Sequence, residues 1–194
     1  ITNSAGAWRC RYKDVVRAMS CSNDSAPGPD GIPFGAWRAL GKLGTDIIYE
    51  MTIALEDRDC KEQLDQAYSD EGEGSSHDYN IGSLVCLPKT ATGEDPELGC
   101  YYTPCDTRPL AIVNADNRLV ASAMRIRWED HLKDYILDRQ QGFLQHRSII
   151  ANLLEVELVM MQTALEKDEG AAIFLDFAAA FPSIAQKFVH KSFQ

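Results

Sequence analysis

The chain has 194 residues, of which 45% are apolar and 25% charged, which is an ordinary composition for a folded globular protein. No stretch approaches the roughly 18 consecutive apolar residues of a membrane-spanning helix, and the residues after Ile1 lack the basic-then-apolar pattern of a signal peptide. The formal charge of −10 argues against non-specific nucleic-acid binding but does not exclude a local site, because residues 70–97 alone hold seven acidic residues against one lysine.

The six cysteines are scattered along the chain and follow no metal-binding pattern. There is no Cys-x-x-Cys pair and no histidine at metal-ligand spacing, so a zinc site is not expected. Cys100 and Cys105 flank a loop and could pair in an oxidising setting, but a chain of this size does not need disulfides. We therefore expect reduced thiols.

The first elements are a short helix and a rigid loop. Residues 11–21 fit a helix with Val15, Val16 and Met19 on one side. The segment 25–33 then holds three prolines and two glycines within seven residues, which fixes a turn-rich loop. Two interpretations stay open: an ordinary helix connector, or a preformed backbone surface held against an extended ligand.

Residues 34–67 are expected to be helical in two pieces that break near Gly41 and Gly44. The apolar side of these pieces would pack in the core and comprises Trp37, Leu40, Ile47, Ile48, Met51, Ile53 and Leu55. The polar, acidic and Gly/Ser-rich stretch 68–80 is typical of a flexible surface loop or insertion, in which His77 would be solvated.

Two strands at 81–87 and 108–114 are expected to pair as a hairpin around a second long, acidic loop at 90–107. The hairpin would present Lys89 and Arg108 side by side. Two cations at the base of a loop suit a polyphosphate, with Lys as a point charge and Arg as a fork or stacking plane. The plainer interpretation is a pair of solvated surface cations.

Two helices should follow the hairpin. The apolar pattern of 115–137 predicts a helix decorated by Arg118, Arg125 and Arg127. The stretch 140–148 breaks that helix, and Ser148 can cap the next one, from Ile149 to about residue 167.

The last motif is an apolar run that ends in a single carboxylate at Asp176. Bounded by Gly170 and Pro182, the run suits a buried strand that delivers Asp176 to a cleft. An isolated ionised carboxylate there would need a cation or several donors, unless Asp176 merely caps the next turn.

Taken in order, these motifs resemble reverse transcriptases, most closely those of non-long-terminal-repeat retrotransposons. The likeness covers residues 12–190. Each motif is weak alone, and the set is stronger in this order: Ala26-Pro-Gly-Pro-Asp-Gly-Ile32, Leu87-Pro-Lys89, Arg108-Pro-Leu with Asn114, Gln141-Gly-Phe143 with Arg147-Ser-Ile149, and Phe174-Leu-Asp176-Phe-x-x-Ala-Phe181.

The resemblance implies an α/β (α+β) fold: an N-terminal helix at 1–22, fingers of a right-hand polymerase at 23–168 with acidic loops at 68–80 and 90–107, and the first palm strand at 169–194. It implies a catalytic, metal-binding Asp176, with the Phe177 carbonyl as a second metal contact. The implied nucleotide-binding residues are Lys89, Arg108, Gln141, Gly142 and the sugar gate Phe181. The implied template-binding residues are Pro27, Gly28, Asp30, Gly31, Ile32, Phe143 and Arg147.

The implied reaction is RNA-templated nucleotidyl transfer with two Mg²⁺ ions. Its partners would be an RNA template, a DNA primer and deoxynucleoside triphosphates, together with the rest of a polyprotein that supplies the palm and thumb. Whether an endonuclease is attached stays open. The resemblance implies no membrane partner and an intracellular location. One Asp cannot hold two ions, and the sequence contains no adjacent Asp pair. We therefore expect a piece of a longer protein that is inactive alone.

Two alternatives stay open. One is a degenerate or repurposed domain that binds RNA without catalysis. The other is a related polymerase, either a group II intron maturase or an RNA-dependent RNA polymerase. A Rossmann-type enzyme is disfavoured because no Gly-x-Gly-x-x-Gly follows a strand.

Overall fold

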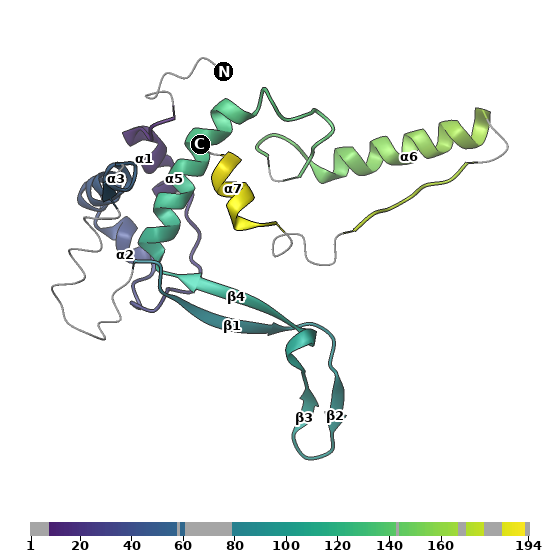
Figure 1. The fold of residues 1–194 in the computed structure, drawn as a ribbon, viewed down its shortest axis with the longest axis horizontal. Helices are drawn as coiled ribbons and strands as arrows, with labels where there is room; N and C mark the ends of the chain where they lie inside the picture. Colours follow the sequence, from purple (N-terminus) through teal and green to yellow (C-terminus); the bar gives the residue numbers. More distant parts are fainter. Residues whose placement is uncertain are drawn as a thin grey trace. The chain divides into compact units, whose positions relative to one another are not determined.

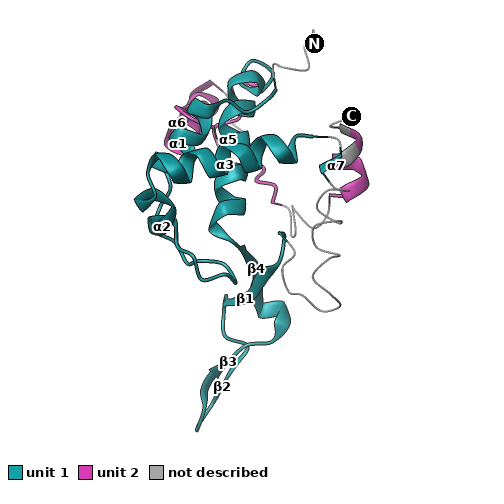
Figure 2. Cartoon of the chain, turned by 90° about the vertical axis from the view of Figure 1, so that its left-hand side faces the viewer, with its two compact units in different colours: residues 1–136 teal, residues 137–194 magenta. Residues whose placement is uncertain are grey.

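The structure is a computed structural model that describes residues 8–57, 59–60, 79–142, 144–166, 170–176 and 184–192. It divides into two compact units, residues 1–136 and residues 137–194 (Figure 2). Among the described residues no helix is both long and apolar enough to cross a bilayer.

The described chain combines helices with two small antiparallel sheets, which agrees with the coarse α+β expectation (Figure 1). The first unit contains α1 (Tyr12–Ser20), α2 (Phe34–Ala39), α3 (Lys42–Leu55), β1 (Gly82–Pro88), β2 (Gly93–Asp95), β3 (Gly99–Tyr101), the 3₁₀ turn η1 (Pro104–Asp106), β4 (Thr107–Val113) and α5 (Ala115–Leu132). The second contains α6 (Ile149–Glu166) and α7 (Gln186–Ser192).

The hydrophobic core described by the structure lies in the first unit, where α1 and α3 pack against α5. Val15, Ile48 and Leu119 are its largest fully buried apolar side chains. The prediction for α1 was right for Val15 and Met19 but wrong for Val16, which is exposed. One of the four residues that α1 buries is not apolar: it is Asp14, which carries a carboxylate.

Asp14 is buried because a single arginine satisfies it. Arg11, just before α1, donates from its backbone N–H and Nε to Oδ2 of Asp14, at 3.0 and 2.8 Å, and from Nη2 to Oδ1 at 2.8 Å. Burial alone would raise the pKa of Asp14, but these hydrogen bonds outweigh it and hold the pKa below its usual value. The start of α1 therefore depends on Arg11.

The expected break between α2 and α3 occurs at Gly41, whose φ of 56° is left-handed and suits glycine. Gly44 does not break the helix. It lies buried inside α3, where a Cβ would come within 2.5 Å of the Trp37 carbonyl, so glycine there allows close packing of the two helices. The helix α3 ends at Leu55, and the helix predicted for residues 61–67 lies outside the described part.

The predicted hairpin is confirmed as β1 paired antiparallel with β4, in a register that places Leu87 opposite Arg108. The stretch 90–107 is not the irregular loop we expected. It forms a second hairpin, β2–β3, and the turn η1 (Figure 1). The Tyr101 ring covers Gly93 across this second hairpin, where a Cβ would lie 2.6 Å from the tyrosine oxygen.

In the second unit, Ser148 caps α6 as predicted, because its Oγ accepts the Ile150 N–H at 3.2 Å. The predicted buried strand before Asp176 is wrong for this chain. Residues 170–176 are not assigned to any strand, and Ile173, Phe174 and Leu175 are 80–89% exposed. The apolar run predicted burial, but no neighbouring strand among the described residues supplies it.

We predict that Arg11→Ala lowers the free energy of unfolding of the first unit by about 2 kcal/mol, because it removes both guanidinium hydrogen bonds and leaves the buried Asp14 carboxylate only the backbone N–H. The loss should shrink as pH falls below the usual Asp pKa, since a protonated Asp14 no longer needs the cation. Trp fluorescence during urea unfolding measures it selectively, because all three tryptophans (Trp8, Trp37 and Trp128) lie in this unit.

The matched control is Arg125→Ala, which removes an i,i+4 pair with Glu129 on α5 and should cost about 0.5 kcal/mol or less. Equal losses for the two arginine variants would contradict the special role of Arg11.

Candidate functional site

The loop Pro27–Ile32 is held against the start of α5. The amide Oδ1 of Asn114, the residue before α5, accepts the backbone N–H of Asp30 at 3.2 Å. Gly28 lies so close to Asn114 that an added Cβ would come within 2.4–2.5 Å of it. Two motifs that are more than 80 residues apart in sequence therefore form one contact.

Arg118, one turn further along α5, binds the two residues that lead into this loop. Its Nη1 donates to Ser25 Oγ at 3.1 Å, and its Nη2 donates to the carbonyl oxygen of Ala26. Its guanidinium also stacks 4.6 Å from the centroid of the Phe34 ring. The guanidinium is thus bound on the loop side by hydrogen bonds and on the α2 side by stacking.

Inside the loop, a tight turn is closed by the Gly31 N–H, which donates to the Gly28 carbonyl at 3.0 Å. Gly31 has a φ of 72°, a conformation that other residues rarely adopt. Asp30 Oδ1 accepts the Ile32 N–H at 3.0 Å, which fixes the exit from the turn. These bonds favour the preformed-surface interpretation of the loop over a passive connector.

Two carboxylates lie near this attachment. Burial is the main cause that raises the pKa of Asp116, in the first turn of α5, and the charge of Asp30 adds to it. Asp116 also accepts the Asn117 N–H at 2.7 Å. The neighbourhood of the loop is therefore negative, apart from the bound Arg118.

The far end of the β1–β4 hairpin carries the two predicted cations. The register places Arg108 opposite Leu87, and the Lys89 N–H donates to the Asp106 carbonyl at 2.9 Å. Because side chains alternate along a strand, Lys89 and Arg108 fall on the same face as diagonal neighbours, and both are exposed. The predicted strand pairing is confirmed, and the joint role of Lys89 and Arg108 toward a phosphate stays a prediction.

Asp106 is held beside these cations by two hydroxyl groups, those of Thr92 and Thr103. These hydrogen bonds, with a smaller contribution from the charge of Lys89, keep the pKa of Asp106 below its usual value. The Lys89 ammonium lies 3.5 Å from the Cys105 carbonyl. A fixed carboxylate and the β2–β3 hairpin therefore define the surroundings of Lys89.

The loop and the cations lie at opposite ends of one strand. Arg108 is six residues before Asn114 along β4, a separation of about 20 Å at the usual strand rise. An extended strand of nucleic acid could contact both ends, whereas a small ligand could not.

In the second unit, Arg147 closes the segment that precedes α6. Its Nη1 donates to the carbonyl oxygens of Leu137 and Gln140 at 2.6 and 2.7 Å, and its Nη2 lies 3.5 Å from Asp138. Gln141 donates to the Asp138 carbonyl at 2.8 Å. The side chains of Arg147 and Gln141 therefore bind backbone carbonyl groups in this structure. Their predicted roles in ligand binding, and that of the neighbouring Gly142, stay predictions.

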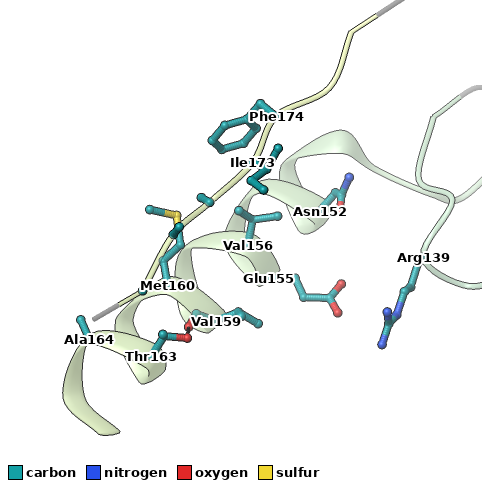
Figure 3. Close-up of a pocket in the computed structure, with 13 residues that line it drawn as sticks. Arg139, Asn152, Glu155, Val156, Val159, Met160, Thr163, Ala164, Ile173 and Phe174 are labelled. Atoms are coloured by element: carbon teal, nitrogen blue, oxygen red, sulfur yellow. Dashed lines mark hydrogen bonds between the residues drawn. The ribbon is translucent and has the colours of Figure 1, made fainter. Parts of the chain in front are cut away.

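Asp176 ends the extended segment 170–176 and is exposed, so its carboxylate is accessible and not enclosed by aliphatic side chains. Next to the same segment, α6 borders an open groove of about 830 Å³, with Val156, Val159 and Met160 on its floor (Figure 3). The described residues contain no group of three or more side chains suited to hold a metal ion. Phe143, Phe177 and Phe181 lie outside the described residues.

Sequence reasoning missed three residues that the structure places at these sites: Arg118, Asp106 and Asp116. Arg118 looked like surface decoration on a helix. A signal for it existed, since it lies four residues after Asn114 and thus on the same face of α5. Nothing local marked Asp106, whose partners Thr92 and Thr103 become neighbours only through the second hairpin.

Comparison of the sequence with protein-family models gives no matching model, and no curated protein matches it either.

We predict that Arg118→Ala speeds hydrogen exchange of the Asp30, Gly31 and Ile32 amides by about tenfold, because it removes the two hydrogen bonds that hold Ser25 and Ala26 at the entry to the loop. Arg125→Ala removes the same charge from the same helix without touching the loop and should leave these amides unchanged. Unchanged exchange in the Arg118 variant would show that Asn114 alone holds the loop.

We predict that Asp116→Asn stabilises the first unit at neutral pH and loses this advantage in acid. The raised folded-state pKa means that the ionised carboxylate costs stability, a cost that is absent below its usual value of 3.8 and appears as pH rises through the folded-state pKa. Melting temperatures of the variant and the parent protein between pH 3 and pH 8 measure this. A constant difference across that range would contradict it.

Proposed function

We propose that this chain is part of an RNA-directed DNA polymerase of the non-long-terminal-repeat type, in which its first unit contacts the template and the incoming nucleotide. The observation that carries the proposal is the bonding between motifs. Asn114 of one motif accepts the Asp30 N–H of another, and the segment around Lys89 pairs with the segment around Arg108. Motifs that act on one substrate should meet in space, and two such pairs do.

The two hairpin cations would bind the triphosphate of the incoming nucleotide. Both are exposed on one face of the β1–β4 hairpin, and Asp106 fixes the backbone next to Lys89. Phosphoryl transfer depends mostly on positioning and on neutralising developing charge, which two converging cations supply. The roles of Phe181 as sugar gate and of Gln141 and Gly142 as nucleotide contacts stay predictions that follow from the resemblance.

The Mg²⁺ ions that the resemblance implies do not fit the described residues by themselves. Asp176 supplies one carboxylate, whereas two ions need several, and the described part has no group of three ligands. We therefore derive no metal step from these residues. The exposed apolar segment before Asp176 supports a role in which a neighbouring strand covers it and supplies further carboxylates.

We predict that Asp176→Asn lowers primer extension on an RNA template by about a hundredfold or more while template affinity stays close to normal. The measurement uses the longest reading frame that contains these residues. Asp134→Asn removes an exposed carboxylate of the same kind and should leave extension unchanged. Near-normal extension by the Asp176 variant would remove this carboxylate from the reaction.

We further predict that the 194 residues alone do not incorporate nucleotides on a primed RNA template, because they hold one of the required carboxylates. Magnesium-dependent extension by the pure 194-residue chain would contradict the assignment.

One observation favours a second candidate, RNA binding without catalysis. Asp176 lies in the described part without the further carboxylates that two metal ions need, which suits a domain that has lost chemistry and keeps one local contact surface. Two adjacent aspartates in a strand-turn-strand further along the reading frame would favour the polymerase.

Incorporation of dNTPs over NTPs would separate a reverse transcriptase or maturase from an RNA polymerase.

A further inference from the structure

The loop Pro27–Ile32 has used nearly all of its backbone donors within the protein. Its prolines carry no N–H group, and three of its four N–H groups are already donated, those of Asp30, Gly31 and Ile32. Of the four N–H groups of the loop, only that of Gly28 has no acceptor within the described part of the chain. The loop therefore offers almost nothing that could bind an oxygen of a phosphate group.

Its acceptors, in contrast, remain available. Of its carbonyl oxygens, only that of Gly28 accepts a hydrogen bond in the described part of the chain, from Gly31. Every residue of the loop except Gly28 is exposed. The carboxylates of Asp30 and Asp116 add negative charge, and the nearby guanidinium of Arg118 is already bound to Ser25, Ala26 and Phe34.

A surface of acceptors with negative charge selects ligands that donate hydrogen bonds. Along a nucleic-acid strand the phosphates accept, whereas the ribose 2′-hydroxyl, which DNA lacks, can donate. The proline rings and the exposed Ile32 add apolar surface beside the carbonyls, which suits the carbon face of a sugar.

We infer that the loop Pro27–Ile32 binds 2′-hydroxyl groups of the template through its carbonyl oxygens and so distinguishes an RNA template from a DNA template. This inference rests on the proposed function, which supplies the template, but it adds the chemical group that is recognised. Arg118 and Asn114 act as positioning residues, since they hold the loop in the conformation that turns its donors inward.

The test replaces single template sugars in a primer–template bound to the longest reading frame that contains these residues. Three forms are compared at each position: 2′-hydroxyl, 2′-deoxy and 2′-fluoro, which cannot donate. At the positions that contact the loop, both substitutions should weaken binding about threefold to tenfold, the value of one neutral hydrogen bond. Binding of the 2′-fluoro form as tight as the 2′-hydroxyl form would overturn the inference, because a surface of acceptors needs a donor.

Protein variants are compared by the ratio of their affinity for the 2′-hydroxyl template to their affinity for the 2′-fluoro template. This ratio is used because a change in the net charge of the protein affects both affinities equally. Arg118→Ala should bring this ratio close to one, whereas the matched Arg125→Ala should leave it unchanged. Gly28→Ala, which forces the loop away from Asn114, provides a second variant without a change of charge. A ratio that stays at the parent value in both loop variants would place recognition elsewhere and overturn the inference.

Primer extension on RNA and DNA templates, measured in parallel, separates this inference from the proposed function. Extension without any dependence on the 2′-hydroxyl would refute the inference and leave the polymerase standing. Binding of neither RNA nor DNA, with binding of an arginine-rich peptide in their place, would refute both.

Discussion

The structure depends on the first turn of α5. Its inner face packs into the core through Ala115 and Leu119, and the preceding Asn114 accepts a hydrogen bond from the Pro27–Ile32 loop. Because β4 runs directly into α5, the same turn also fixes one end of the β1–β4 hairpin. Asn114 does not cap its own helix, since its amide is used by the loop. A local capping bond is thus replaced by a contact between distant motifs, which couples core stability to the shape of the candidate site.

Elements with strong local signals could be predicted from the sequence. The apolar pattern gave α5 and α6, Ser148 gave the start of α6, and alternating strands with turn residues gave the β1–β4 hairpin. The β2–β3 hairpin was missed because its three-residue strands carry glycine and acidic residues, which have low strand propensity. The strand before Asp176 was overpredicted, because an apolar run indicates burial only when something covers it.

The candidate site divides in the same way. The placement of Lys89 and Arg108 on one face of the hairpin followed from the pairing of the two strands and from the alternation of side chains along each strand. Both can be inferred from a single sequence. The roles of Arg118 and Asp106 did not, because each depends on a residue brought near by another element. The rigid loop could be foreseen from its prolines, but not which of its polar groups would remain available. That depends on the count of hydrogen bonds, and this count favours hydroxyl groups over phosphates as its ligand.

The central proposal is that Lys89 and Arg108, exposed at one end of the β1–β4 hairpin, bind the triphosphate of an incoming nucleotide. The most direct test is the KM for dNTP in primer extension by the longest reading frame that contains these residues. The account predicts that Lys89→Ala and Arg108→Ala each raise this KM about tenfold, because each removes a charge-assisted hydrogen bond, whereas Lys133→Ala, which removes an exposed cation from the same unit, leaves it unchanged. A KM that stays at the parent value in both hairpin variants would contradict the proposal.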